Sequence, residues 1–373
     1  MKKIAIASAI ALASITAAHA APTVYGKVLL TGEYTDVDDK TSKNDDTSST
    51  KLVSNFSRIG FKGEDDLTDT TKLVYQLEYG IDVDAASNQD SKGKDKNQFY
   101  SRNTYIGLAH NTMGTLLAGR YDTPFRLAKG GVDVFNDYDN VWLGKLMAGE
   151  QRVDNVIAYK SPTLVGVPVT FLGAVSLDEC SKNDDDKCVA TPAVAAVAPQ
   201  AIYDVTGKDI IGYTKGTPAK PAVYRDKKNA YSAMVNYDQN GVYIGLGYDN
   251  SVYGKDTSGW RLAGSVDMGK MNMVDGLTLG ALYQNYDFNT DDNEKSWLLS
   301  GKYKIGATPW AVKAQYIDTS NQSGVKDRDA TEVALGAEYS FNKATKGHLY
   351  AAQIDTDNVS DKTIVGGGLE YKF

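Results

Sequence analysis

Apolar and charged residues alternate along most of this chain with a period of two. Residues 71–83 show the pattern most clearly, because one parity is apolar and the other is charged or amide-bearing. The apolar set is Leu73, Tyr75, Leu77, Tyr79 and Ile81, and the polar set is Lys72, Gln76, Glu78 and Asp82. Since successive side chains of a strand point to opposite faces of a sheet, the pattern predicts a strand with two unlike faces.

The same alternation recurs from residue 24 to the C-terminus. We count sixteen such segments, each of about 8–13 residues, which is the length of a tilted strand that crosses a bilayer. The face predicted to point outward carries Val24, Val28, Leu30, Tyr34, Phe61, Phe171, Trp260, Leu262, Trp297, Leu299, Val333, Leu335, Leu369 and Tyr371. The opposite face carries Lys27, Glu33, Arg58, Arg261, Ser300, Lys302, Glu332, Glu338 and Glu370. These segments predict an all-β fold.

Short and long connections alternate between the segments. The short ones carry turn-forming residues and span residues 65–70, 111–114, 238–241 and 341–346, and the long ones are polar and span residues 36–55, 85–97, 121–152, 178–228 and 319–330. A soluble β-sandwich also shows alternation, but it does not explain one charged face on strand after strand and Tyr and Trp on the other face. We therefore predict a transmembrane antiparallel β-barrel of sixteen strands, with the loops at one end.

The N-terminus has the three parts of a secretory signal peptide. Lys2 and Lys3 give a positive start, residues 4–15 are almost all apolar, and an Ala-His-Ala cleavage site ends at Ala20. The apolar run is too short to cross a membrane. We expect residues 1–20 to be a signal peptide and residues 21–373 to be the exported barrel domain. Loss of the two lysines would change the net charge from −7 to −9.

The third long connection, residues 121–152, is too long for a compact link between two strands. It mixes acidic, basic and aromatic side chains, which include Asp133, Asp137, Asp139, Arg126, Lys129, Lys145, Phe125, Phe135, Tyr138 and Trp142. A long ordered loop of this composition must pack against another part of the chain. We predict that it folds into the lumen of the barrel and narrows it.

The connection at residues 178–228 contains both cysteines, Cys180 and Cys188. Export permits a disulfide, and the spacing between the two residues gives a closable loop. We interpret them as a candidate disulfide on an exposed loop, in preference to a redox or metal site. The Ala-, Pro- and Val-rich residues 190–201 that follow predict a flexible surface loop and not a separate domain.

Five short motifs follow one another along the exported chain. They are APTVYGK at residues 21–27, SRIGFKGEDDL at 57–67, SRNTYIGLAH at 101–110, GRY at 119–121 and YKF at 371–373. Together they resemble the general diffusion porins of Gram-negative bacteria, and the match covers essentially the whole exported chain. The resemblance implies a sixteen-stranded homotrimeric barrel among outer-membrane lipids and lipopolysaccharide. It also implies passive passage of ions and small hydrophilic solutes through a pore narrowed by the third loop.

In this family, basic residues on the barrel wall face acidic residues on the inner loop. The resemblance assigns the pore constriction to Lys27, Arg58, Arg102 and Arg152 on the wall, and to Asp133 and Asp137 on the loop. The Pro-Glu-Phe-Gly-Gly run of enterobacterial porins is missing from this loop, which puts the two aspartate assignments in doubt.

Strand parity tests the wall assignments independently of the resemblance. It supports Lys27, Arg58 and Arg152, because each alternates with apolar neighbours. The segment around Arg102 is not cleanly amphipathic, so parity gives it less support. Arg120 is a further inward candidate, on the parity opposite to Leu117 and Tyr121.

Other function classes find less support in the sequence. Only His110 and His348 remain after the leader, and the chain has no GxSxG, HExxH or phosphate-loop motif, so we expect no catalytic site, metal or cofactor. The acidic net charge argues against nucleic acid. A ligand-specific channel, an adhesive or structural barrel acting through its surface loops, and a barrel enzyme resembling outer-membrane lipases and proteases remain as alternatives. Acidic loops favour cations and a basic constriction favours anions, with a weak balance toward cations.

Overall fold

The computed structural model describes residues 21–41, 47–84, 98–163, 167–177, 187–191, 201–203, 210–213, 223–226 and 229–373. The chain divides into two compact units. The first contains the chain up to Ser176 and from Ala230 onward, and the second is Leu177–Asn229. Each unit is described by itself.

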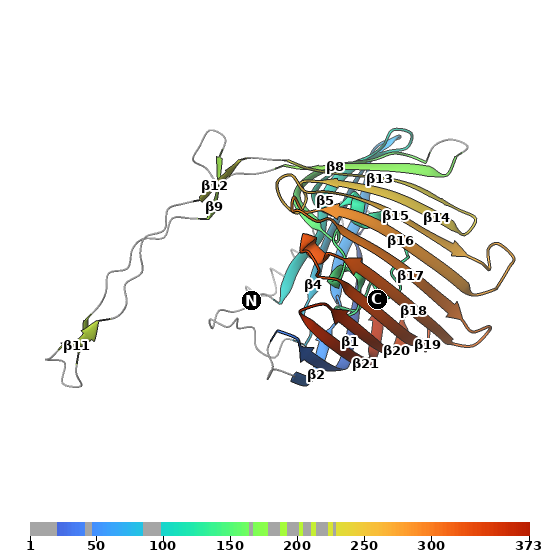
Figure 1. Ribbon diagram of the computed structural model, residues 1–373. Coiled ribbons are helices and arrows are strands. Elements are labelled where there is room, and N and C mark those ends of the chain that lie inside the picture. The colour runs from blue at the N-terminus through green and yellow to red at the C-terminus, as the bar shows by residue number, and fades with distance from the viewer. Residues whose placement is uncertain are drawn as a thin grey trace, which may run out of the picture. The chain divides into compact units, whose positions relative to one another are not determined.

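The first unit is a closed antiparallel barrel in which almost every strand pairs with its neighbours in sequence (Figure 1). Its first half contains β1 (Thr23–Asp39), β2 (Thr47–Ser54), β3 (Arg58–Thr68), β4 (Thr71–Ile81), β5 (Phe99–His110), β6 (Gly114–Asp122), β7 (Arg152–Lys160) and β8 (Val169–Ser176). Its second half contains β13 (Ala230–Gln239), β14 (Val242–Asn250), β15 (Ser258–Asp267), β16 (Leu277–Asp287), β17 (Glu294–Lys304), β18 (Trp310–Ser320), β19 (Ala330–Ser340), β20 (Thr345–Thr356) and β21 (Ser360–Lys372). β8 pairs with β13, and β21 pairs with β1 to close the sheet.

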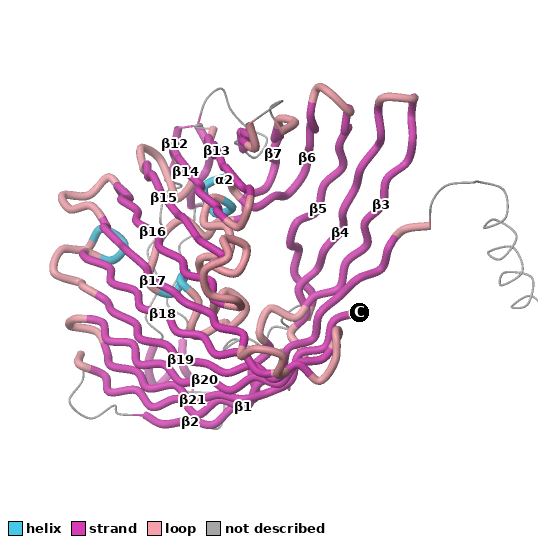
Figure 2. The backbone as a smooth tube through the Cα atoms, turned by 90° about the vertical axis from the view of Figure 1, so that its right-hand side faces the viewer, coloured by secondary structure: helices cyan, strands magenta, loops and turns pink. Residues whose placement is uncertain are grey.

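β2 and β3 act as one interrupted strand of the barrel. Both pair antiparallel with β1, on either side of a break at residues 55–57. Phe56 within the break has a φ of 49°, which an ordinary strand cannot contain. Counted in this way, the barrel has sixteen strands, as predicted. Figure 2 shows these strands side by side around the barrel, and the predicted all-β antiparallel barrel is confirmed.

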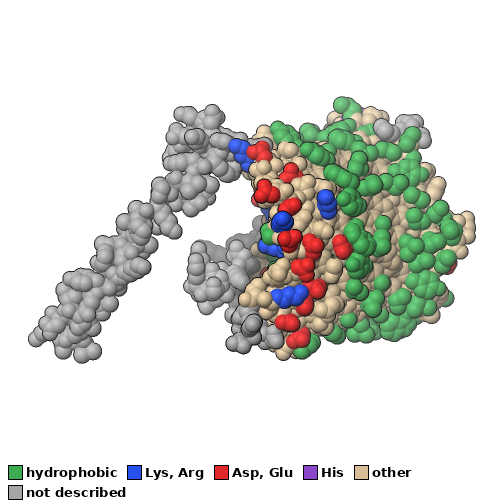
Figure 3. Space-filling view, in the orientation of Figure 1, with side chains coloured by type: hydrophobic (Ala, Val, Ile, Leu, Met, Phe, Trp, Pro, Cys, Tyr) green, Lys and Arg blue, Asp and Glu red, His purple; other side chains and the backbone are tan. Residues whose placement is uncertain are grey.

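The two faces of the wall are as unlike as the alternation predicts. On β1, Val24 is 50% exposed and Glu33 is 2% exposed. On β14 and β15, Leu246 is 51% exposed and Arg261 is fully buried. Figure 3 shows hydrophobic side chains covering the outer surface of the strands and charged side chains gathered toward one rim. Such an outer surface fits a bilayer, while the polar groups face inward.

The two ends of the barrel differ in the way the sequence predicts. At one end, neighbouring strands are joined by short turns, such as the link between β13 and β14 through Asn240 and Gly241. These two residues have positive φ angles of 53° and 82°, which suits a tight hairpin turn. The longer connections lie at the other end, and one of them contains the 3₁₀ turn η2 (Gln322–Gly324).

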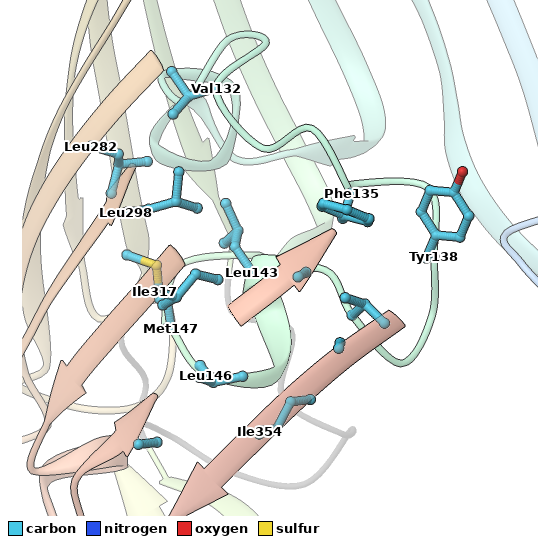
Figure 4. Close-up of a cluster of buried hydrophobic side chains, with 14 of the residues drawn as sticks. Val132, Phe135, Tyr138, Leu143, Leu146, Met147, Leu282, Leu298, Ile317 and Ile354 are labelled. Atoms are coloured by element: carbon cyan, nitrogen blue, oxygen red, sulfur yellow. The ribbon is translucent and has the colours of Figure 1, made fainter. Parts of the chain in front are cut away.

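The connection between β6 and β7, residues 123–151, contains α2 (Pro124–Leu127) and the 3₁₀ turn η1 (Leu143–Lys145). Thr123 caps α2 by accepting a hydrogen bond from the Arg126 N–H, and Pro124 occupies the first turn, where it loses no helical bond. Apolar side chains of this loop pack on apolar side chains of the wall (Figure 4). The loop provides Val132, Phe135, Tyr138, Val141, Leu143, Leu146 and Met147, and the wall provides Leu282, Leu298, Ile317, Tyr350 and Ile354, among others.

The described residues of the second unit form two short antiparallel ladders. β9 (Lys187–Thr191) pairs with β12 (Val223–Asp226), and β10 (Ala201–Tyr203) pairs with β11 (Ile210–Tyr213). The prediction of a flexible surface loop did not include these strands, which form where Val, Ile and Tyr favour extended backbone. Cys180 lies outside the described residues, so the disulfide with Cys188 stays a prediction. In the described part of the chain, no helix is long and apolar enough to span a membrane.

Candidate functional site

The start of the β6–β7 loop is bound to the wall at β13 and β14. The N–H of Phe125 donates to the Ser232 hydroxyl at 3.0 Å. The Tyr243 hydroxyl donates to the carbonyl of Ala128 at 2.9 Å. These two bonds hold α2 against β13 and β14.

The end of the loop is bound to Arg261 of β15, which is fully buried. Its guanidinium donates to Glu150 at 2.7 Å and to the carbonyl of Ala148 at 2.8 Å. The same group lies 4.5 Å from the centre of the Phe125 ring. Arg261 therefore contacts both the start and the end of the loop. Its guanidinium presents several N–H donors in a planar fork, which a lysine could not supply.

The middle of the loop is bound to β18 and β20. Lys313 Nζ donates to the carbonyl of Val134 at 3.0 Å and to the Tyr138 hydroxyl at 3.1 Å. The Tyr138 hydroxyl lies 2.7 Å from Nδ1 of His348. The N–H of Val134 donates to Gln315 at 3.1 Å. These bonds fix the backbone of the loop to the wall beside the apolar cluster.

The next residues of the loop contact the strands around the β2–β3 break. The N–H of Asp139 donates to Asn55 at 2.8 Å, and the amide of Asn140 donates to Glu33 at 2.7 Å. Asn55 in the break at residues 55–57 therefore accepts a hydrogen bond from the backbone of the loop.

A first series of ion pairs runs from β1 across the loop to β5. Lys27 lies 2.7 Å from Asp137, and Arg58 lies 3.8 Å from the same carboxylate. Arg58 is also 3.8 Å from Glu78 of β4, and Arg102 of β5 lies 2.6 Å from Glu78. The loop carboxylate thus sits between two cations of the wall, and these cations belong to a chain of alternating charges.

A second series runs from β7 through β6 to the end of the loop. Arg152 lies 2.9 Å from Asp122, and Arg126 lies 3.3 Å from it. Arg126 also lies 3.5 Å from Glu150, which accepts from Lys129 at 2.5 Å. Asn103 of β5 bonds to both Asp122 and Arg152 at 2.9 Å. Because Asn103 adjoins Arg102, the two series meet on β5.

Basic groups exceed acidic groups in these two series. The seven basic side chains are Lys27, Arg58, Arg102, Arg126, Lys129, Arg152 and Arg261, and the four carboxylates are Glu78, Asp122, Asp137 and Glu150. Asp133, at 4.0 Å from Lys129, is a fifth carboxylate. Within these two series basic groups therefore outnumber carboxylates, although the whole chain is acidic.

Three of the four loop carboxylates, Asp133, Asp137 and Glu150, differ in their surroundings. Burial raises the pKa of Asp133, because Lys129 only partly offsets the cost of ionising a buried carboxyl. Burial also opposes ionisation of Asp137, but Lys27 and Arg58 outweigh it and lower its pKa. For Glu150 the nearby cations, led by Lys129 and Arg261, outweigh burial and lower the pKa to about 2. Asp137 and Glu150 are therefore held as anions by their partners.

The structure brings several of the sequence-predicted residues together. Lys27, Arg58 and Asp137 meet, and Arg102 joins them through Glu78. Arg152 belongs to the second series. Asp133 lies elsewhere, because its buried carboxylate accepts the backbone N–H groups of Phe135 and Leu143 within the loop.

The inward placement of Arg120 rested on a wrong assignment of faces. Leu117 and Tyr121 were expected to point outward, but both lie in an apolar cluster with Leu127 of the loop. Arg120 shares the parity of Leu116, which is 48% exposed, and its guanidinium pairs with Asp154 at 2.5 Å. The reason is that the wall carries apolar side chains on both faces here, so that parity cannot distinguish inside from outside.

Sequence analysis missed most of the partners in the two series. Parity places Glu78 and Arg261 on the inward face, but it gives no pairing. Glu150 and Asp122 carried no signal beyond their charge, because Arg261 and Arg152, which pair with them, are remote in sequence. A search for inward carboxylates on strands next to Arg58 would have found Glu78.

Comparison with known proteins gives one consistent result. The Gram-negative porin family matches residues 5–359. The major outer membrane protein P.IA of Neisseria meningitidis serogroup B is 27% identical over 337 residues, which cover 87% of this chain and 74% of that protein. An outer membrane porin protein of Bordetella pertussis is 26% identical over 404 residues, with full coverage of both chains.

Solved structures of low sequence identity share the fold. OmpF of Salmonella typhi, in complex with daunomycin, has a TM-score of 0.62 at 15% identity and covers 94% of this chain and 97% of its own. A trimer form of OmpT from Vibrio cholerae has a TM-score of 0.53 at 15% identity and covers 95% of this chain and 100% of its own. The closed barrel, its charged interior and the match along nearly the whole chain agree, and this chain belongs to the Gram-negative porin family, whose members form outer-membrane channels for passive diffusion.

Proposed function

We propose that the β6–β7 loop lies in the lumen and that the pore is narrowest where this loop faces β1, β3, β5 and β7. The wall side of this constriction is formed by Lys27, Arg58, Arg102 and Arg152, and the loop side by Asp137. The observation that carries the proposal is the position of Asp137 between Lys27 at 2.7 Å and Arg58 at 3.8 Å. Asp133 and Arg120 are not part of this constriction.

Charges arranged in this way produce a field across the pore. Water and dipolar solutes align with the field, whereas an apolar solute would displace aligned water and gain nothing in return. The protein walls have a low dielectric constant and concentrate the field in the aqueous gap. The constriction therefore favours small hydrophilic solutes.

The excess of basic side chains gives the constriction a preference for anions. Its four basic side chains, Lys27, Arg58, Arg102 and Arg152, pair with three carboxylates, Asp137, Glu78 and Asp122. The acidic groups of the long loops lie in bulk electrolyte, where salt screens them beyond about 8–10 Å. Since the groups nearest the permeating ion outweigh the net charge of the chain, we propose anion preference in place of the weak sequence-based expectation of cation preference.

The remaining features of the working protein follow from its relatives and its sequence. Cleavage after Ala20 would release residues 21–373 into the periplasm for insertion among outer-membrane lipids and lipopolysaccharide. A homotrimer is supported by the trimer form of the Vibrio relative. Catalysis is not part of the proposal, because the relatives are named as porins and outer membrane proteins.

The test is the current across a planar lipid bilayer after addition of purified, folded protein under a gradient of potassium chloride. We expect stepwise increases in current and a zero-current potential of the sign that chloride preference gives. A zero-current potential of the sign that potassium preference gives would contradict the basic constriction. A folded barrel that passes no current would contradict the open pore.

A further inference from the structure

In addition to Arg261 of β15, two connections at the long-loop end of the barrel hold the end of the β6–β7 loop, residues 145–149. The first connection is residues 251–257, between β14 and β15, and the second is residues 321–329, between β18 and β19. Short turns join the strands at the opposite end of the barrel. Both connections therefore belong to the end that faces the outside of the cell in this family.

The first connection contributes Tyr253. The N–H of Gly149 donates to the Tyr253 hydroxyl at 2.9 Å. The Tyr253 ring lies edge-on to the rings of Tyr286 and Phe288, with the ring centres 5.2 Å and 5.4 Å away. Tyr286 is fully buried. Because two aromatic contacts fix the ring, its hydroxyl is held in position for the loop backbone.

The second connection contributes Gln322. Its side-chain amide donates to the carbonyl of Lys145 at 3.0 Å and to the carbonyl of Leu146 at 3.3 Å. The connection is bound in turn to the one between β20 and β21, because the N–H of Asp357 donates to the carbonyl of Asp329 at 2.8 Å. The end of the β6–β7 loop is therefore part of a network that includes the outer surface of the protein.

A buried carboxylate joins the second connection to the loop. Glu294, the first residue of β17, is 1% exposed. One of its oxygens accepts the N–H of Ala148 at 2.7 Å, and the other accepts the N–H of Ser323 at 2.9 Å. Gln284 of β16 donates to the same carboxylate at 3.1 Å. Since a buried carboxylate that loses its donors is costly, Glu294 stabilises the arrangement in which the loop and the connection are both in place.

We propose that the two connections form an external clamp on the β6–β7 loop, and that Tyr253, Gln322 and Glu294 are positioning residues of the pore constriction. The proposal rests on the placement of this loop in the lumen, and it adds that the position of the loop is set in part from the cell surface. A loop that is held at both ends has fewer conformations than a loop that is held at one end. Release of the clamp therefore lets residues 145–149 enter the pore more often and interrupt the current.

The experiment compares the wild type with Tyr253→Phe, Gln322→Leu and the double variant in single-channel recordings across planar bilayers with potassium chloride. Tyr253→Phe keeps the ring and removes the acceptor of the Gly149 N–H. Gln322→Leu keeps a side chain of similar size and removes the donors to the loop carbonyls. We expect brief closures to become about threefold more frequent in each single variant and about tenfold more frequent in the double variant.

Two matched controls change similar side chains that lie away from the loop. Tyr248→Phe alters a tyrosine of β14 that is 49% exposed on the outer face, and Lys326→Leu alters an exposed residue of the second connection. Both should close as rarely as the wild type. Gln322→Lys restores an N–H donor and should bring the closure frequency back toward that of the wild type. A purely structural role of Gln322 in packing would not give this recovery.

A second measurement tests the clamp without the current. Hydrogen exchange at the backbone N–H groups of residues 145–149, followed by mass spectrometry, should be about threefold faster in Tyr253→Phe and Gln322→Leu than in the wild type and the controls. Faster exchange in a folded barrel that passes no current would support the clamp and reject the pore function. Exchange that is unchanged in both variants would overturn the clamp and leave the pore intact. Closures as rare as in the controls would overturn the positioning role of these residues.

Discussion

The hydroxyl of Tyr138 on the loop lies 2.7 Å from Nδ1 of His348 on β20, and the same hydroxyl oxygen accepts from Lys313 on β18. Because an ammonium group only donates, the tyrosine oxygen is the acceptor in the bond from Lys313. A single hydroxyl therefore joins the loop to two strands.

Removal of this hydroxyl should loosen the loop. Tyr138→Phe keeps the ring in the apolar cluster but leaves Lys313 and His348 each without one partner, at a cost of about 1–3 kcal/mol. We expect brief closures in single-channel recordings to become about tenfold more frequent. Tyr159→Phe is the control, because the Tyr159 hydroxyl bonds to the Met113 carbonyl at a turn. Similar closure rates in the two variants would show that the Tyr138 bond does not restrain the loop.

The barrel was predictable from the sequence because lipid on one side and water on the other act on each strand separately. On β1, alternation with a period of two is enough to assign Val24 to the outer face and Glu33 to the inner face, without information from the rest of the chain. The break at residues 55–57 was not predicted, because residues 36–55 were assigned to a polar connection, whereas β1 continues to Asp39 and β2 forms at Thr47–Ser54. The break depends on a positive φ angle at Phe56, which no residue pattern in the sequence predicts.

The site was predictable only in part, for a physical reason that Arg120 and Arg58 illustrate. Arg58 lies in a segment whose outer face alone is apolar, so that its inward direction is clear. Arg120 lies beside Leu116 and Leu117, one exposed and one buried, because the loop adds an apolar contact to the inner wall. Pairings such as Arg261 with Glu150 depend on how the loop packs against the wall, which local patterns do not contain.

Neutralising Arg58 should move ion preference toward cations. Its side chain is 25% exposed beside Asp137, so Arg58→Gln removes a charge near the permeating ion. The interaction of this partly screened charge with a permeating ion is about 0.5–1 kcal/mol. Its loss corresponds to a change of about two- to fivefold in the chloride-to-potassium permeability ratio. The zero-current potential under a salt gradient measures this ratio. Arg120→Gln should leave it unchanged, and an equal shift in both variants would refute the separate placement of the two arginines.

The two aspartates of the loop should differ in their effects. Asp137→Asn removes the carboxylate between Lys27 and Arg58 and should increase chloride preference by about two- to fivefold. Asp133→Asn should leave ion preference unchanged but weaken the turn, because one of its two backbone N–H partners would face an amide NH₂. The zero-current potential and the closure rate, measured in both variants, test this difference between the two aspartates. A shift in potential with Asp133→Asn would place Asp133 at the pore.

Arg261 should be the most costly residue of the loop anchor to replace. Arg261→Met leaves the buried Glu150 with two cations in place of three and removes the donors to the Ala148 carbonyl. Breaking a buried pair of this kind costs about 3–5 kcal/mol. We expect the barrel to unfold at a lower temperature in a gel-shift assay with detergent. Arg261→Lys should recover only part of the loss, and full recovery would show that the fork is unnecessary.

The charge of Glu150 makes the anchor sensitive to strong acid. Its pKa is lowered from the usual 4.5 to about 2, since nearby cations led by Lys129 outweigh the effect of burial. A carboxylate with a lowered pKa contributes stability that is complete above its unfolded value and is lost as the pH falls through its folded value. Closures of the wild-type channel should therefore stay rare down to about pH 5 and increase between about pH 4.5 and pH 2.

A comparison of two variants assigns this pH dependence to Glu150. Glu150→Gln leaves Lys129, Arg126 and Arg261 without their shared anion, so the channel should close frequently at pH 7 already and respond less to acid. Glu64→Gln is the control, because Glu64 is an exposed carboxylate that pairs with Lys72 on the wall. It should behave as the wild type does. An acid response in Glu150→Gln as large as that of the wild type would assign the effect to other carboxylates of the pore, since Glu150 would then contribute nothing to it.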